Sequence, residues 1–127
     1  MKKHFLKFMS LFLCLALVGV LSSCNLKGLT VDEAKTNLEA AGYTVTVREG
    51  EEFIDSGDCQ FDAIFSTELE KYLYAVKGEE KIYMYFFVTV DTASNNYTFM
   101  NMNGLRSGQN NKTVYFGTKQ AIKDSKI

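Results

Sequence analysis

The cysteines of this chain are the residues with the most distinctive chemistry. Cys24 closes an apolar run where a more polar chain begins, and Cys59 lies in a stretch rich in acidic residues. Neither has a histidine nearby in sequence, because the only histidine among 127 residues is His4. Neighbouring cations activate a thiol, whereas Cys59 has only Asp58 and Asp62 close to it. Apolar neighbours such as Phe61 favour burial, so we expect Cys59 to be buried and inert rather than nucleophilic.

The first 24 residues have the layout of an export signal. Lysines at positions 2, 3 and 7 precede an apolar run from Phe8 to Leu21, and small residues lead up to the cysteine. The run of about 14 residues is shorter than the roughly 20 that a membrane-spanning helix needs. We therefore predict that residues 1–23 are a signal peptide.

The sequence Leu21-Ser22-Ser23-Cys24 resembles the lipobox of bacterial lipoproteins, in which a leucine and two small residues precede a cysteine. The resemblance implies a diacylglyceryl group on the Cys24 thiol, cleavage between Ser23 and Cys24, and acylation of the new amine. Two or more acyl chains anchor a protein stably. Residues 24–29 would then be the lipidated cysteine and a short tether on the extracytoplasmic face of a cell membrane. The alternative is an ordinary signal peptide or an uncleaved anchor.

Composition excludes several classes of function. Without residues 1–23 the chain has 104 residues, enough for one domain, and its 11 basic and 15 acidic residues give a net charge of −4. Nucleic acid is excluded as a partner, because phosphate binding needs a basic patch. The remaining chain offers no histidine to zinc, and lipidation of Cys24 leaves Cys59 without a disulfide partner. We expect no metal and no cofactor.

Residues 30–47 carry the clearest structural pattern. Thr30 and Glu33 match a capping box, in which each side chain satisfies an amide that the first helical turn leaves open. Apolar residues then recur at three- and four-residue spacing as far as position 41, and a glycine follows where a helix would end. The next residues alternate as a half-buried strand does. We predict a helix with Leu38 in the core, followed by a strand.

The run from Gly28 to Val47 also resembles the helix–strand unit of PASTA domains, which dock penicillin-binding proteins and kinases onto peptidoglycan. It shares five residues with that unit at the expected offsets, Gly28, Ala34, Leu38, Gly42 and Val45. The resemblance covers about 20 residues, and the chain beyond it shows no second strand pair of this type. It implies that a cell-wall component is the ligand.

The middle of the chain predicts a loop and a hairpin. Residues 49–62 contain six carboxylates at a spacing that does not match a calcium-binding loop, so we expect a solvated acidic loop. Residues 71–90 are rich in aromatic and β-branched residues around a turn at Gly78, which predicts two strands, although the first arm also suits a helix. From Ile82 to Val88 both faces are apolar, as in a central strand covered on both sides.

The last third of the chain is less regular. Residues 91–103 fit either a helix capped by Asp91 or a strand, because their asparagines favour turns over helix. A polar loop is expected over 104–111, a strand over 113–116 and a short final helix capped by Thr118.

These elements together predict an α+β fold over residues 30–127, with an antiparallel sheet of about four strands packed by one to three helices. Such a scaffold serves many functions. We expect a non-catalytic module that binds a cell-envelope protein or cell-wall component. Tyrosine is favoured at binding surfaces, and the candidate surface consists of the hairpin tyrosines, at least two with exposed rings: Tyr72, Tyr74, Tyr83 and Tyr85.

Two other functions remain open on the sequence. One is an inhibitor or accessory subunit of an envelope enzyme or transporter. The other is a small hydrolase that uses two carboxylates, Glu68 or Glu70 with Asp91. A concave pocket with carboxylates about 5–10 Å apart would favour the hydrolase, whereas a convex aromatic patch would favour binding or inhibition.

Overall fold

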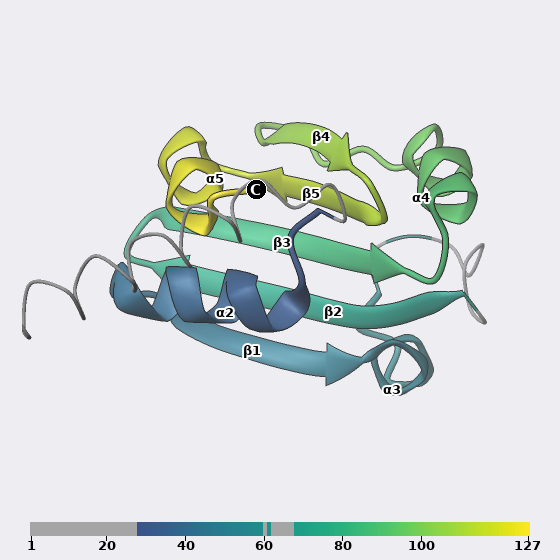
Figure 1. The fold of residues 1–127 in the computed structure, drawn as a ribbon, viewed down its shortest axis with the longest axis horizontal. Coiled ribbons are helices and arrows are strands. Elements are labelled where there is room, and N and C mark those ends of the chain that lie inside the picture. Colours follow the sequence, from purple (N-terminus) through teal and green to yellow (C-terminus); the bar gives the residue numbers. More distant parts are fainter. Residues whose placement is uncertain (1–27, 60, 62–67) are drawn as a thin grey trace, which may run out of the picture.

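The computed structural model describes residues 28–59, 61 and 68–127. The predicted signal peptide, its cleavage site and Cys24 lie outside these residues. Within the described part, no helix is long and apolar enough to cross a membrane. A single five-stranded antiparallel sheet and four helices account for the regular structure of these residues, which confirms the α+β prediction (Figure 1).

The sheet is built around a central hairpin with two edge strands. The elements are, in chain order, α2 (Val31–Ala40), β1 (Thr44–Glu49), α3 (Gly50–Asp55), β2 (Leu69–Lys77), β3 (Glu80–Phe87), α4 (Val90–Tyr97), β4 (Arg106–Asn110), β5 (Thr113–Gly117) and α5 (Lys119–Ser125). The strands lie in the order β1-β2-β3-β5-β4, and each neighbouring pair is antiparallel. The predicted hairpin is therefore confirmed, with β3 in the middle of the sheet, but β3 ends at Phe87 rather than at residue 90, and Val88 is exposed.

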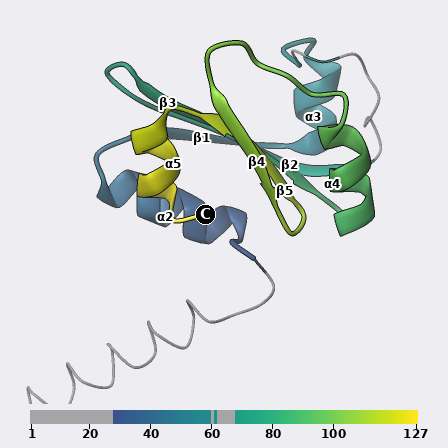
Figure 2. The same cartoon turned by 90° about the horizontal axis from the view of Figure 1, so that it is seen from above.

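Both faces of the sheet are covered, as the two apolar faces of β3 predict. On one face, which we call the helical face, α2 and α5 cover Ile82, Met84 and Phe86. On the other, which we call the tyrosine face, Tyr85 and Phe87 pack with residues of α3 and α4. Figure 2 shows the α2–α5 pair and the α3–α4 pair at opposite ends of the sheet.

Local sequence signals explain α2. The hydroxyl of Thr30 accepts from the Glu33 amide, and the Glu33 carboxylate accepts from the Thr30 amide, so the predicted capping box forms. Ala34 and Leu38 are fully buried against the sheet. Gly42 has a φ of +94° after the helix ends, a conformation that costs glycine little. The prediction for this segment is confirmed.

The acidic segment is not the loop that we predicted, because it contains α3. Phe53 is 2% exposed and packs into the tyrosine-face core, while Glu51, Glu52 and Asp55 on the same helix are exposed. Gly50 allows this packing, since a Cβ there would lie 1.8 Å from the Leu69 carbonyl oxygen. Burial of one aromatic ring therefore decides the conformation of a segment whose composition favours solvent.

Two further differences concern the last third of the chain. Residues 90–97 form α4, but its N-cap is Thr89 rather than Asp91, because the Thr89 hydroxyl accepts from the Thr92 amide. The predicted loop over 104–111 contains β4, a polar edge strand whose residues pair with β5. Its conformation comes from this pairing, since its own residues have little β-propensity.

Candidate functional site

The four candidate tyrosines lie side by side on the tyrosine face. Tyr72 of β2 pairs with Tyr85 of β3, and Tyr74 pairs with Tyr83. The ring centroids are 5.5 Å apart in the first pair and 4.8 Å in the second. The alternation of the hairpin residues thus brings all four together, as the sequence predicts.

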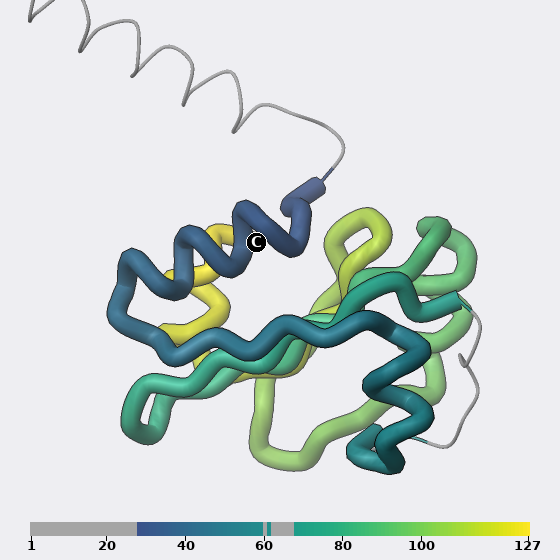
Figure 3. Tube along the Cα trace, turned by 90° about the horizontal axis from the view of Figure 1, so that it is seen from below, coloured from purple at the N-terminus to yellow at the C-terminus, as the bar shows by residue number. Residues whose placement is uncertain are grey.

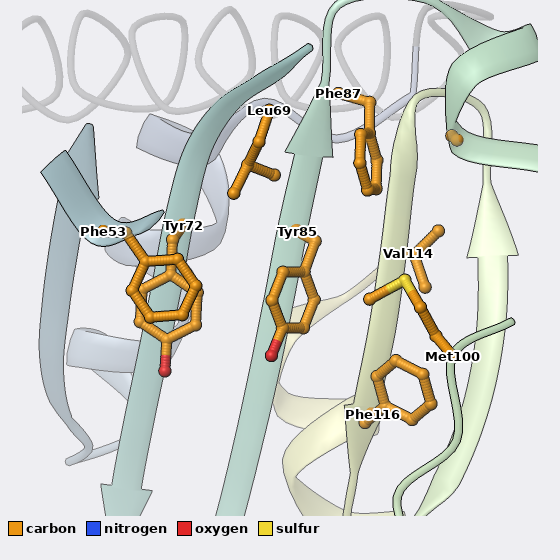
Figure 4. Close-up of a cluster of buried hydrophobic side chains, with 9 residues drawn as sticks. Phe53, Leu69, Tyr72, Tyr85, Phe87, Met100, Val114 and Phe116 are labelled. Carbon is orange, nitrogen blue, oxygen red and sulfur yellow. The ribbon is translucent and has the colours of Figure 1, made fainter. Parts of the chain in front are cut away.

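Only one of these pairs reaches the surface. Tyr72 is 8% exposed and Tyr85 is fully buried, so their place in the predicted binding surface is wrong. The reason is α3, whose Phe53 ring stacks on Tyr72 at 3.8 Å between centroids. Tyr74 and Tyr83 are half-buried, because they lie farther along the sheet. Figure 4 shows Phe53 over Tyr72 and the Tyr85 ring between Tyr72 and the β5 side chains.

A pocket of about 610 Å³ opens where α3 and α4 leave the tyrosine face uncovered. Its apolar wall joins the half-buried Tyr83 with two side chains of the 98–105 loop, Met102 and Leu105, and with Phe61. Polar groups from three segments complete the rim. The described residues that line the pocket are Phe61, Lys81, Tyr83, Asn101, Met102, Asn103, Gly104, Leu105 and Thr118.

The tyrosine hydroxyls next to the pocket are held in their neutral form. Burial raises the pKa of Tyr85 and of Tyr72 far above the usual value, and nearby tyrosines raise both further. Burial, followed by its neighbour Tyr83, also raises the pKa of Tyr74. At neutral pH these groups therefore donate and accept hydrogen bonds but do not act as phenolate nucleophiles.

The Tyr85 hydroxyl is buried, and no described residue hydrogen-bonds it. Figure 4 shows the hydroxyls of Tyr72 and Tyr85 pointing in the same direction along the strands, toward the start of β3. Tyr83, which lines the pocket, lies in that direction. A buried hydroxyl that no described residue bonds is a costly feature, because a buried polar group without a partner loses its hydration.

The other candidate residues lie away from this pocket. Glu68 accepts from the hydroxyl of Thr92 in α4, and Glu70 and Asp91 are exposed. None of these carboxylates is among the described pocket residues. Cys59 is half-buried against the tyrosine-face core, as a free thiol. Across residues 28–59, 61 and 68–127, no three His, Cys, Asp or Glu residues are grouped to hold a metal ion.

Sequence reasoning missed the pocket loop. The sequence predicts turns at Asn101 and Asn103, whereas in the structure both line the pocket with Lys81 and Thr118. The density of asparagine between positions 95 and 103 was the available signal, because an amide both donates and accepts hydrogen bonds.

Comparisons with protein-family models, curated proteins and solved structures found no match to this chain. The resemblance of residues 28–47 to a PASTA unit and that of residues 21–24 to a lipobox stay predictions.

Removing the Tyr85 hydroxyl should not destabilise the fold. We expect Tyr85→Phe to raise the free energy of unfolding by about 1 kcal/mol, because it deletes a buried hydroxyl that has no partner among the described residues. Tyr43→Phe is the matched control, since the Tyr43 hydroxyl donates to Asp124 at 2.8 Å and its loss should lower stability by about 1 kcal/mol. Urea denaturation compares the stabilities of the two variants. Equal destabilisation would contradict the conclusion that the Tyr85 hydroxyl has no partner among the described residues.

Proposed function

We propose that this chain is a membrane-anchored extracytoplasmic lipoprotein whose domain binds a saccharide of the cell envelope without transforming it. The proposed anchor rests on the Leu21–Cys24 sequence and the apolar run before it. The binding role rests on one observation, the pocket in which Tyr83 and apolar loop residues face polar groups of the rim.

The chemistry of the pocket suits a sugar ring. A saccharide has faces of C–H groups and a perimeter of hydroxyls. The half-buried Tyr83 ring, with Met102 and Leu105, offers apolar area to such a face. Asn101 and Asn103 can donate to and accept from hydroxyls at the perimeter.

The size of the pocket also fits this role. Its volume of about 610 Å³ lies within the range of roughly 300–1,000 Å³ that small-ligand sites occupy. Lys81 adds a cation on the rim, which would favour a saccharide that carries a carboxylate or an acidic peptide. Fragments of peptidoglycan combine these features, and they are the ligand class that we infer.

A protein partner is the second candidate. β1 is an edge strand of the sheet, free of proline, with Thr44, Thr46 and Val47 exposed. Such an edge can pair with an extended segment of another chain. An inhibitor or accessory subunit could use this strand, in which case binding would not depend on the pocket.

Titration of peptidoglycan fragments against residues 25–127 tests the proposal. We expect Tyr83→Ala to weaken binding at least tenfold, which corresponds to about 1.4 kcal/mol. Phe99→Ala is the control, because Phe99 is 69% exposed and is not among the described pocket residues. Isothermal titration calorimetry measures the affinity of each variant for the fragments. Equal affinities of Tyr83→Ala and the unchanged domain would exclude the pocket, and loss of cell-envelope binding only on change of β1 would favour the protein partner.

A further inference from the structure

The first described residues lie against the turn between β4 and β5. Gly28 is so close to that turn that a Cβ on it would be 2.9 Å from Asn111 Cβ and 3.5 Å from Asn110 Oδ1. Its φ of +77° is one that glycine adopts freely. Figure 3 shows the start of the described chain beside this turn. The point at which the proposed tether enters the domain is therefore defined.

The beginning of α4 lies at the same end of the sheet. The Gln109 side-chain amide donates to the Asn111 carbonyl at 3.0 Å and to the Val90 carbonyl at 3.4 Å. The Phe87 amide donates to the Lys112 carbonyl at 2.9 Å. Gly28, the β4–β5 turn and the chain between β3 and α4 thus form one surface, which we call the tether end.

This surface exposes two aliphatic side chains. Val88, which follows β3, is 48% exposed, and Val90, the first residue of α4, is 43% exposed. Lys112 in the β4–β5 turn is exposed beside them. Carboxylates of Glu68 and Asp91 are also exposed near this end, so the surface has no net positive character that would attract anionic lipids.

The length of the tether limits the distance of this surface from a membrane. Four residue steps separate Cys24 from Gly28, and a fully extended chain spans at most about 3.6 Å for each step. If Cys24 carries lipid, Gly28 lies within about 14 Å of the anchor. A reach this short brings the tether end close to the headgroups.

We propose that the tether end contacts the headgroup layer of the membrane through Val88, Val90 and Lys112. The pocket lined by Tyr83 consequently opens away from the membrane. The inference rests on the proposed lipid anchor. The bilayer surface is the proposed partner, and the two aliphatic side chains make the main contact, because the carboxylates of Glu68 and Asp91 offset the charge of Lys112. The contact should therefore be insensitive to salt.

The pocket lies at the other end of the strands. Lys81 and Tyr83 come from the beginning of β3, and Thr118 follows the end of β5, whereas Thr113 at the start of β5 adjoins the tether end. The five residue steps from Thr113 to Thr118 span about 17 Å at the rise of a strand. With the tether end on the membrane, this separation directs the pocket toward ligands in the cell wall.

Fluorescence quenching of the lipidated protein in phosphatidylcholine vesicles tests the orientation. The full chain would be expressed with its anchor, with Cys59→Ser as background, and labelled at Val90→Cys, Lys112→Cys or Glu79→Cys. Glu79 lies exposed in the β2–β3 turn and serves as the distant position. A nitroxide on the lipid headgroup should quench the labels at 90 and 112 at least threefold more strongly than the label at 79.

The outcomes separate this inference from the proposed function. Protein that does not float with the vesicles would overturn the anchor and the orientation together. Floating protein with equal quenching at 79, 90 and 112, or with the strongest quenching at 79, would overturn the orientation alone. The label at 112 repeats the test independently if a substitution at 90 disturbs α4.

Discussion

We expect Leu38→Ala to lower the free energy of unfolding by about 2–5 kcal/mol, the range found when a large buried side chain becomes alanine. Leu38 has no exposed surface and belongs to the helical-face core with Leu73, Ile82 and Met84. The substitution removes apolar contacts and leaves a cavity between α2 and the sheet, because neither element can close fully onto the other. Urea denaturation of residues 25–127 measures the change.

Glu39→Ala is the matched control for this prediction. Glu39 is the next residue of the same helix and is exposed, so its substitution should change stability by less than about 0.5 kcal/mol. A loss below about 1 kcal/mol in Leu38→Ala would show that α2 does not pack on the sheet through Leu38.

The second large effect concerns the proposed anchor. We expect Cys24→Ala to abolish incorporation of a labelled fatty acid into the protein, because the thiol is the proposed point of attachment. Two controls are available in the chain. Cys14→Ala removes a cysteine inside the predicted signal peptide, and Cys59→Ser removes the half-buried thiol of the domain.

Both control variants should incorporate as much label as the unchanged protein. Metabolic labelling followed by capture of the protein gives the comparison directly. Label that persists in Cys24→Ala, or label that is lost in Cys59→Ser, would assign acylation to another residue or exclude it.

The parts of the fold that could be predicted are those with local signals. The capping box and the apolar spacing of α2 act within one helix, and the hairpin around Gly78 joins two strands that are neighbours in sequence. Both faces of β3 are apolar, which predicts that each face of this strand is covered by other parts of the fold.

The elements that were missed depend on distant partners. α3 forms because the Phe53 ring is buried on Tyr72, which lies 19 positions later in the chain. β4 forms because its backbone pairs with β5 at the edge of the sheet. Composition describes how each segment would behave alone in water, and that preference yields to tertiary contacts.

Dependence on contacts between distant segments also limits how much of the site the sequence can predict. Alternation along the hairpin correctly placed the four tyrosines on one face, but only the position of α3 decides that Tyr72 is covered while Tyr74 remains half-exposed. The pocket is lined by residues from four separate segments, namely Phe61, β3, the 98–105 loop and Thr118. No spacing in the sequence relates these segments to one another.

The location of the domain and the direction of its pocket both depend on the membrane anchor, and the intact mass of the protein purified from membranes tests that anchor most directly. We predict a chain that begins at Cys24 and carries the added mass of a diacylglyceryl group, with a further acyl chain where the amine is modified. A chain that retains residues 1–23, or a mature chain without acyl mass, would contradict the account.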